Sequence, residues 1–360
     1  MRAVKAAVCH TFGEPLVVED VSLPAPGPNQ IRVELAACAI CHSDIAYAAG
    51  VWDGSLPAVY GHEASGRVAE IGENVDELSV GDHVVVTLIR SCGQCRYCRR
   101  GYEVACSATF PENQPLRNSD GQPIYPAMQT GAFAEEVVVH QSQLVAIDKR
   151  IPLDAAALLG CGVITGVGSV TNVAQVQPGW NVVVVGTGGV GLNVVQGAVL
   201  GGAATTVAVD LSDDKLAAAR MFGATHTVNP STEDVTEAVS AASAGEMADA
   251  VFVTVPSKAP IEEAPALLAP AGAVVLVGLP ATGVMTEIDP LTLADQSQRV
   301  LGSKLGAARI SVDIPKLVEL YEEGRLKLDE LITGRYPLDE INEAIASVER
   351  GEALRHLIVF

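Results

Sequence analysis

Four cysteine residues gather within a stretch of 15 residues in this chain of 360, and their spacing suits a metal ion. Zinc in a closed structural site takes four thiolate ligands in a tetrahedron, and cysteines separated by two residues can wrap around one ion without backbone strain. The spacing therefore predicts a structural zinc site. An iron–sulfur cluster, a redox site or a set of free thiols are the alternatives. The four residues are Cys92, Cys95, Cys98 and Cys106.

Three further residues of metal-binding type lie far apart in the sequence: Cys41, His62 and Cys161. Two cysteines and one histidine form a ligand set of catalytic zinc, which leaves its fourth position to water or substrate. Taken singly, a cysteine is more often part of the buried packing, and a histidine is more often a hydrogen-bonded core residue. Sequence spacing does not show that the three residues meet, so this second metal site is a hypothesis.

A glycine-rich turn in the second half of the chain predicts a dinucleotide-binding site. It follows a valine-rich strand and opens a helix, the context in which backbone amides approach a pyrophosphate at a helix N-terminus. Asp210 ends the next strand, 19 residues beyond the last glycine, where a carboxylate would bind the ribose hydroxyls of NAD and repel the 2′-phosphate of NADP. Lys215 could contact the same ribose, and a solvated carboxylate is the alternative for Asp210. The turn spans residues 186–191, and its candidate cofactor-binding residues are Gly186, Gly188, Gly189, Val190 and Gly191.

The elements that must position these residues fall into two parts and predict an α/β fold. Residues 1–150 hold short valine-rich segments between Gly, Pro and Asn turns. From residue 181 onward strands alternate with helices, which is typical of a doubly wound parallel sheet. A long loop is expected at 107–130, and the tail from about residue 303 should pack on the first part. The predicted strands are 30–37, 66–71, 82–88, 133–140, 181–186, 205–210, 250–255, 273–278 and 356–360, and the predicted helices are 214–222, 314–323, 338–348 and one that ends near residue 200.

Composition excludes several classes of protein. Hydrophobic residues make up 49% of the chain, enough for a large core, and 43 acidic against 23 basic residues give a net charge of −20. Such a field repels phosphate backbones and anionic lipids, so neither nucleic acid nor a membrane is an expected partner. Residues 155–209 lack Asp, Glu, Lys and Arg, but their glycines favour buried parallel strands over a membrane-spanning helix. No signal peptide is evident, and a cytoplasmic location is expected.

On these residues the chain resembles the zinc-containing medium-chain alcohol dehydrogenases along essentially its full length. The resemblance implies a GroES-like, β-rich catalytic domain at residues 1–162 and 305–360, with its structural zinc lobe at 92–106. It implies a Rossmann NAD-binding domain at residues 163–304. NAD and two zinc ions per subunit, one catalytic and one structural, would be the cofactors of a homodimer or homotetramer. The matching motifs are Cys41-His42-Ser43-Asp44, Gly61-His62-Glu63-x-x-Gly66, the lobe, Gly160-Cys161-Gly162 and the glycine-rich turn.

The resemblance also implies roles for single residues. Cys41, His62 and Cys161 look like the ligands of the catalytic zinc. A zinc-bound primary alcohol, small-molecule and of aromatic, allylic or medium-length type, would lose its proton and transfer hydride to NAD, reversibly giving the aldehyde. The other residues carried over are Ser43 as the hydroxyl that takes the substrate proton, Asp44 as the partner that orients the His62 imidazole, Glu63 near the metal, His42 and Arg355 at the cofactor pyrophosphate, and Trp52 and Leu88 in the substrate pocket.

Other functions on the same scaffold stay open. An S-hydroxymethyl-thiol (formaldehyde) dehydrogenase or a polyol dehydrogenase are enzymatic alternatives, although Trp52 stands where glutathione-dependent formaldehyde dehydrogenases carry an acidic residue. A non-catalytic zinc-binding structural protein is an alternative of a different class, but it would be expected to have lost Ser43 or the zinc ligands. Lys304 replaces an apolar residue typical of the family, and we expect its side chain to point to solvent.

The chain has Ala46 where many members of the family have a histidine that ends the proton relay. A proton that leaves Ser43 must therefore pass to water, to a cofactor ribose or to His42. We expect the Ala46→His variant to change both the rate and the pH dependence of alcohol oxidation, because an imidazole titrates near neutral pH. Steady-state kinetics across the neutral and alkaline range measure the effect. Unchanged rates and an unchanged pH profile would contradict the relay interpretation.

Overall fold

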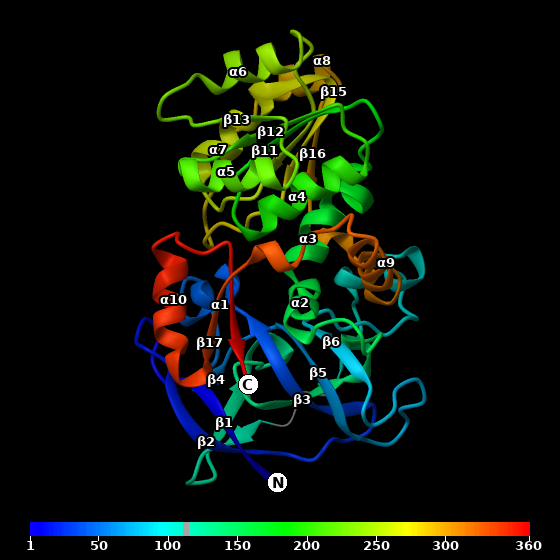
Figure 1. Ribbon diagram of the computed structural model, residues 1–360, viewed down its shortest axis with the longest axis vertical. Helices are drawn as coiled ribbons and strands as arrows, with labels where there is room; N and C mark the ends of the chain where they lie inside the picture. The colour runs from blue at the N-terminus through cyan, green and yellow to red at the C-terminus, as the bar shows by residue number, and fades with distance from the viewer. Residues whose placement is uncertain (111–114) are drawn as a thin grey trace. The chain divides into compact units, whose positions relative to one another are not determined.

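The computed structural model describes residues 1–110 and 115–360, which divide into two compact units. The first unit consists of Met1–Cys161, Arg309–Gly324 and Leu328–Phe360, and the second of Gly162–Ala308 with Arg325–Lys327. The chain therefore leaves the first unit after residue 161 and returns to it at residue 309. Figure 1 labels most of the helices and many of the strands of both units.

The first unit is mostly β-structure. One group of its strands closes into a barrel in the order β1-β2-β7-β8-β4, and another forms a sheet in the order β10-β6-β5-β3-β18-β17, with β9 also paired to β3. Strand β18, near the end of the chain, pairs antiparallel with β3 and parallel with β17, so the tail takes part in this sheet. The strands are β1 (Arg2–Cys9), β2 (Val17–Leu23), β3 (Gln30–Ala39), β4 (Ala58–Val59), β5 (Glu63–Ile71), β6 (His83–Thr87), β7 (Leu116–Arg117), β8 (Pro123–Pro126), β9 (Glu136–His140), β10 (Leu144–Ile147), β17 (Ile332–Pro337) and β18 (Arg355–Val359).

Helix α10 (Ile341–Glu349) shows how the helices of this unit join its core. Its apolar residues Ile341, Ala344 and Val348 recur at helical spacing and therefore share one face. All three are buried in the same hydrophobic cluster as residues of β1 and β3. The other helices of the unit are α1 (His42–Ala48), α2 (Leu153–Ala157) and α9 (Ile310–Glu322), with short 3₁₀ turns that include Cys98–Arg100 and Leu158–Gly160.

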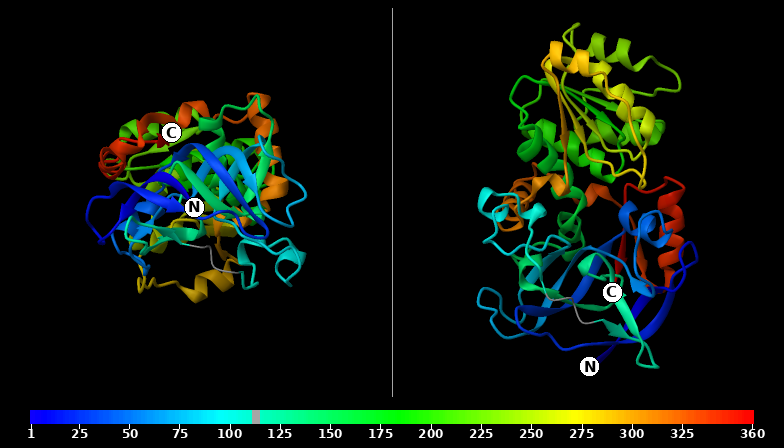
Figure 2. Two further views of the ribbon diagram at one scale, coloured as in Figure 1. Left: turned by 90° about the horizontal axis from the view of Figure 1, so that it is seen from below. Right: turned by 180° about the vertical axis from the view of Figure 1, so that it is seen from behind.

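The second unit is a sheet in the order β13-β12-β11-β14-β15-β16, with helices on both of its faces (Figure 2). Every pairing between these strands is parallel. The chain starts with β11 at the centre of the sheet, runs outward through β12 and β13, and then continues on the opposite side of β11 with β14, β15 and β16. The strand order therefore reverses between β11 and β14. Doubly wound sheets bind their ligands at such a reversal. The elements are β11 (Asn181–Val185), β12 (Thr205–Val209), β13 (His226–Val228), β14 (Ala248–Val253), β15 (Leu268–Leu276), β16 (Arg299–Gly302), α3 (Gly162–Gly168), α4 (Gly189–Leu200), α5 (Asp213–Met221), α6 (Val235–Ala242), α7 (Lys258–Glu263) and α8 (Pro290–Asp295).

The α/β prediction is confirmed, but the loop expected at residues 107–130 is wrong in part. Strands β7 and β8 lie within it and pair antiparallel with each other, and β7 also pairs with β2. The turn that joins them is held by Asn118, whose side-chain oxygen accepts hydrogen bonds from the amides of Asp120 and Gln122. Gly121 takes the left-handed conformation there, with φ of 76°. The Asn-Ser-Asp-Gly sequence is a turn signal that favours a hairpin over a loop. Residues 111–114 lie outside the described residues.

The run without charged residues, 155–209, contains β11, β12 and α4, whose side chains are mostly buried in the second unit. Parallel strands covered on both faces are apolar throughout, which explains the hydropathy of this run. Among the described residues no single helix is long and apolar enough to cross a membrane. One bent pair, Leu153–Gly160 with Gly162–Ala174, reaches that threshold by length and composition only.

Helices α3 and α4 approach closely because α3 carries Gly166 at their contact. A Cβ atom added at Gly166 would lie 2.5 Å from the Cβ of Asn193 and 2.6 Å from the carbonyl oxygen of Val190. We expect Gly166→Ala to lower the free energy of unfolding by about 1–3 kcal/mol, since such overpacking forces the backbone to shift. Urea denaturation measures the change. Gly302→Ala is the matched control, because a Cβ there meets no atom within 4 Å. Equal unfolding energies for the two variants would contradict the packing argument.

Candidate functional site

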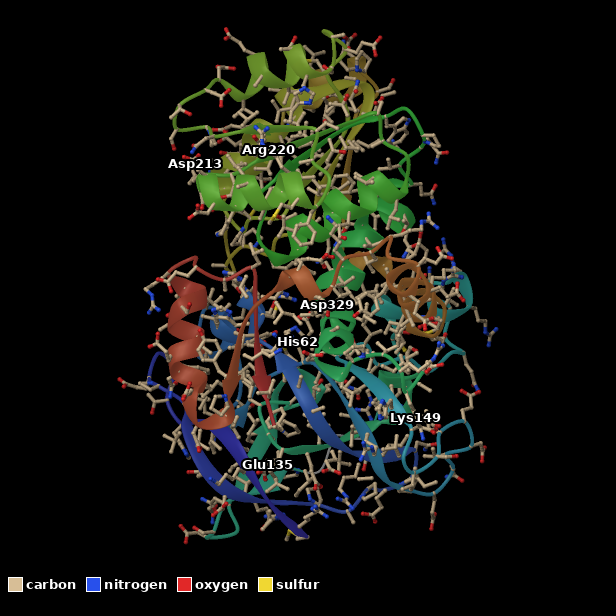
Figure 3. All side chains as sticks on the ribbon, viewed as in Figure 1. His62, Glu135, Lys149, Asp213, Arg220 and Asp329 are labelled. Atoms are coloured by element: carbon tan, nitrogen blue, oxygen red, sulfur yellow. The ribbon has the colours of Figure 1, made fainter. Side chains whose placement is uncertain are left out.

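The carboxylate of Asp44 joins the two chain segments that carry Cys41 and His62. Asp44 lies in the first turn of α1, and its Oδ2 accepts a hydrogen bond from the amide of Cys41 at 3.1 Å. Its Oδ1 accepts from the amide of Gly61 at 2.8 Å and from Nδ1 of His62 at 2.9 Å. With its Nδ1 proton on Asp44, the imidazole presents the Nε2 lone pair on its other side. His62 is buried in the interior of the first unit (Figure 3).

Cys161 lies next to His62, 99 positions away in the sequence, because Gly160 allows the chain before Cys161 to approach the strands closely. A Cβ atom added at Gly160 would lie 2.7 Å from the carbonyl oxygen of Val86 in β6 and 3.2 Å from the Cα of Glu63 in β5. The turn Leu158–Gly160 therefore lies directly against these strands. Sγ of Cys161 then lies 3.3 Å from Nε2 of His62. The ligand atoms of Cys41, His62 and Cys161 lie within 4.8 Å of one another, and all three residues are buried.

The donor set and its electrostatics fit zinc. Tetrahedral ligands on zinc–sulfur bonds of about 2.3 Å and zinc–nitrogen bonds of about 2.0 Å lie roughly 3.5–3.8 Å apart. A hydrogen bond from Cys161 lowers the pKa of Cys41 well below its usual range against the effect of burial. The same bond, together with burial, raises the pKa of Cys161. Burial lowers the pKa of His62, but Asp44 outweighs it and the net shift is upward. The site thus favours one thiolate and retains protons on its other ligands, and a metal cation displaces such protons.

The cysteine lobe brings its four sulfur atoms together as well. Sγ of Cys95 lies 3.5 Å from Sγ of Cys98 and 4.0 Å from Sγ of Cys106. Backbone amides point at the sulfurs, with Cys95 donating to Cys92 at 3.3 Å and Cys98 donating to Cys95 at 3.5 Å. The amides of Cys98 and Ser107 lower the pKa of Cys95 to about 5, whereas burial raises the pKa of Cys98 to about 12. Four thiols that converge in this way fit a closed tetrahedral site.

The glycine-rich turn has the geometry of a dinucleotide site. Gly186 has φ of 89°, and a Cβ atom added at Gly191 would lie 1.8 Å from the carbonyl oxygen of Gly186. Gly188 is the N-cap of α4, where no side chain forms a cap and a Cβ would meet no atom within 4 Å. The start of α4 therefore offers its amides to an anionic group. Asp210 follows β12 beside the turn and accepts a hydrogen bond from the amide of Thr187 at 2.7 Å. Lys215 lies in α5, whose ends Asp213 and Arg220 mark in Figure 3.

Models of two protein families match the chain. "Alcohol dehydrogenase GroES-like domain" covers residues 27–149, and "Zinc-binding dehydrogenase" covers residues 189–323. The chain belongs to the zinc-containing medium-chain alcohol dehydrogenases. The fold and the family that its motifs predict are thereby confirmed.

Individual members of this family are similar to the chain over nearly its whole length. The NDMA-dependent alcohol dehydrogenase of Amycolatopsis methanolica is 35% identical over 99% of this chain and 98% of its own. The S-(hydroxymethyl)glutathione dehydrogenase of Saccharomyces cerevisiae is 35% identical over 98% of this chain and 95% of its own. The crystal structure of benzyl alcohol dehydrogenase from Acinetobacter calcoaceticus matches with a TM-score of 0.93 and 30% identity, and the match covers 100% of both chains.

In this member of the family Arg355, expected at a cofactor pyrophosphate, is buried and forms an ion pair with Glu63. Glu63 has no exposed surface and follows His62 directly at the start of β5. The guanidinium also donates to the carbonyl oxygen of Ile40 at 3.4 Å. Burial lowers the pKa of Arg355, but Glu63 and the neighbouring thiols outweigh burial, and the net shift is upward. The structure thus pairs Arg355 with Glu63, which directly follows the candidate metal ligand His62.

The remaining residues expected at the site lie on or near α1 and β6. Ser43 is half-buried and His42 exposed, both at the start of α1. Leu88, directly after β6, is half-buried, as is Trp52. Sequence analysis missed Tyr47, one helical turn beyond Ser43, whose ring meets Trp52 edge-on at a centroid distance of 5.0 Å. The i, i+4 spacing on α1 is the signal that places it on the face of Ser43. Lys304 is exposed.

We expect Arg355→Met to lower the free energy of unfolding by about 3–5 kcal/mol, because it leaves the buried Glu63 carboxylate without its cation. The double variant Glu63→Gln/Arg355→Met should recover part of that loss, since it buries no unpaired charge. Urea denaturation of the zinc-saturated protein measures both. Arg350→Met is the matched control and should have little effect, because Arg350 pairs with Glu343 and Glu352 on the surface. A small loss for Arg355→Met, or no recovery in the double variant, would contradict this account.

Proposed function

We propose that this dehydrogenase reversibly oxidises a primary alcohol to the aldehyde with NAD as the hydride acceptor. The observation that carries the proposal is the buried group of Cys41, His62 and Cys161, whose imidazole is oriented by Asp44. These residues would hold a zinc ion and leave one tetrahedral position to the alcohol oxygen. When bound, such an ion supplies Lewis-acid polarisation of that oxygen, which lowers the pKa of the alcohol.

Ser43 is the residue that we assign to the substrate proton. It precedes Asp44 on α1, and because the Asp44 carboxylate is tied to the amides of Cys41 and Gly61, the start of the helix is fixed. The half-buried Ser43 hydroxyl accepts the proton of the alcohol and passes on its own. With Ala46 in the next turn, that proton continues to water, to a ribose hydroxyl or to His42.

NAD is favoured over NADP by the carboxylate at the end of β12. Asp210 lies beside the glycine-rich turn, to which it is hydrogen-bonded through Thr187. A carboxylate at this place accepts hydrogen bonds from the two ribose hydroxyls of NAD and repels the additional phosphate of NADP. Lys215 lies at the start of α5, near enough in sequence to contribute to the same ribose.

An aromatic alcohol is the substrate class that we favour. The ring of Tyr47 contacts Trp52 edge-on and stacks on Tyr60 at a centroid distance of 6.3 Å. The hydroxyl of Tyr60 donates to the carbonyl oxygen of Tyr47, so the rings are tied to α1. Aromatic rings next to the helix of Ser43 suit a planar, apolar substrate. The similarity to benzyl alcohol dehydrogenase supports the same class. Allylic and medium-length alcohols would use the same surface, to which we also assign Leu88.

A second candidate is oxidation of an S-hydroxymethyl thiol. The similarity to the yeast S-(hydroxymethyl)glutathione dehydrogenase favours it. Trp52 argues against a glutathione adduct, because a half-buried indole carries no negative charge to pair with a glutathione ammonium group. The two candidates differ in one requirement, since only the second needs an added thiol.

We further propose a second, structural zinc ion in the lobe of Cys92, Cys95, Cys98 and Cys106. Its four thiols converge and leave no ligand position for a substrate. The proposal therefore amounts to two zinc ions per chain. A homodimer or homotetramer and a cytoplasmic location stay predictions.

Incubation of the purified protein with NAD and, separately, benzyl alcohol, ethanol, sorbitol or formaldehyde with glutathione tests the function through NADH absorbance. We expect the fastest reduction with benzyl alcohol and two zinc ions per chain by elemental analysis. Ser43→Ala should lower kcat by roughly 10²–10⁴-fold at unchanged zinc content, since it removes the proton acceptor. Ser79→Ala, an exposed serine of the same unit, is the control and should leave kcat unchanged. Reduction only in the presence of glutathione would favour the second candidate, and a zinc-replete protein that is inactive in every assay would contradict both.

A further inference from the structure

Thr187 makes contacts with Asp210 that the glycine pattern did not predict. It is the second residue of the glycine-rich turn and has no exposed surface. Its amide donates to Oδ2 of Asp210 at 2.7 Å, and its side-chain hydroxyl donates to the same oxygen at 3.2 Å. The other carboxylate oxygen, Oδ1, accepts from the amide of Ser212 at 3.0 Å. Three protein donors thus fix the plane of the carboxylate.

The turn does not need the Thr187 hydroxyl for its own shape. On the side of β14, the Thr254 hydroxyl donates to the carbonyl oxygen of Gly186 at 2.7 Å and lies 3.1 Å from that of Val185. The amide of Gly186 donates to the carbonyl oxygen of Val209 at 2.8 Å. Two neighbouring strands therefore hold the first residue of the turn. The Thr187 side chain is left to act on Asp210 alone. Of the three donors to Asp210, the Thr187 hydroxyl is the one that a substitution removes without changing a backbone group.

The fixed carboxylate keeps room for a ligand. A carboxylate can accept about four hydrogen bonds, and the protein supplies three donors, two of which share Oδ2. The Oδ1 atom retains a lone pair, so at least one ribose hydroxyl can bind without displacing a protein group. A carboxylate held in one plane attracts a ribose hydroxyl and repels a phosphate, and the strength of each interaction depends on the orientation of that plane.

We propose that Thr187 is a positioning residue for dinucleotide selection, whose hydroxyl holds the Asp210 carboxylate in the orientation that accepts the ribose of NAD and rejects the 2′-phosphate of NADP. The inference rests on the proposed dinucleotide site. It does not depend on the identity of the alcohol or on the metal ligands, because all of its residues belong to the second unit.

Calorimetric titration of the full-length protein with NAD and with NADP, in the absence of alcohol, tests the inference. Thr187→Val keeps the shape and the amide but removes the hydroxyl. We expect roughly a five-fold rise in Kd for NAD, the value of one hydrogen bond, with no rise in Kd for NADP. The ratio of the two affinities should therefore fall by about the same factor. Thr187→Ser, which restores the hydroxyl, should recover most of the wild-type ratio.

Thr254→Val is the matched control within the same turn. It removes a half-buried hydroxyl that bonds to the backbone of the turn rather than to Asp210. The variant should therefore weaken the binding of both dinucleotides by a similar factor and leave the ratio of their affinities unchanged. An unchanged ratio of the NAD and NADP affinities in Thr187→Val, or no recovery of that ratio in Thr187→Ser, overturns the inference. In that case, alcohol oxidation by the wild-type protein still upholds the proposed function. A shifted ratio in a protein that oxidises no alcohol supports the inference and contradicts the proposed function. A wild-type protein that binds neither dinucleotide overturns both.

Discussion

The Asp44 carboxylate accepts hydrogen bonds from the amides of Cys41 and Gly61 and from the imidazole of His62, and these bonds tie two metal-ligand segments together. Two of the donors are backbone groups, so the carboxylate is held by the fold and not by another flexible side chain. Its orientation then decides which nitrogen of His62 is free for a metal. The position of Ser43 follows from the same anchor, because the residue lies directly before Asp44 on α1.

A buried cluster of this composition needs either protons or a metal cation to balance its charge. Asp44 and Glu63 are buried carboxylates, and both thiols must lose their protons to act as ligands. Arg355 is the buried cation paired with Glu63, and it balances one of these charges. The uncompensated negative charge cannot be stable in a low-dielectric interior. Protons on the thiols and on His62 remove that charge in the absence of a metal, and a divalent ion removes it otherwise. Because Arg355 already balances the charge of Glu63, the protons or the metal ion need to balance only the remaining negative charge of the cluster.

Local signals in the sequence predicted the motifs well, and contacts between distant segments poorly. The cysteine lobe, the glycine-rich turn and the parallel sheet are encoded by spacing and periodicity over a few residues, and the structure contains all of them. The approach of Cys161 to His62 depends on the contact of Gly160 with β6. No sequence pattern near Cys161 indicates this contact, so only the family resemblance predicted that Cys161 and His62 share a site. The resemblance predicts Arg355 at the cofactor pyrophosphate, and its pairing with Glu63 could not be read from the sequence because it arises only when β18 joins β3. The hairpin of β7 and β8 did carry a local signal, in the turn at Asn118.

The carboxylates of Asp44, in the first unit, and Asp210, in the second unit, are held in place in a similar way. Each carboxylate must face a polar group in a fixed direction, and each is fixed by two backbone amides that belong to neighbouring chain segments. A side-chain substitution leaves a backbone amide in place. Most substitutions around Asp44 and Asp210 should therefore leave the orientation of these two carboxylates unchanged. Side chains next to these two carboxylates add to what the backbone amides fix. In this chain Ala46 adds nothing beside Asp44, whereas Thr187 adds one hydroxyl to Asp210. In the proposed function the proton path is thus left to water, to a ribose hydroxyl or to His42, while the Thr187 hydroxyl adds a side-chain donor to the two backbone amides that fix Asp210.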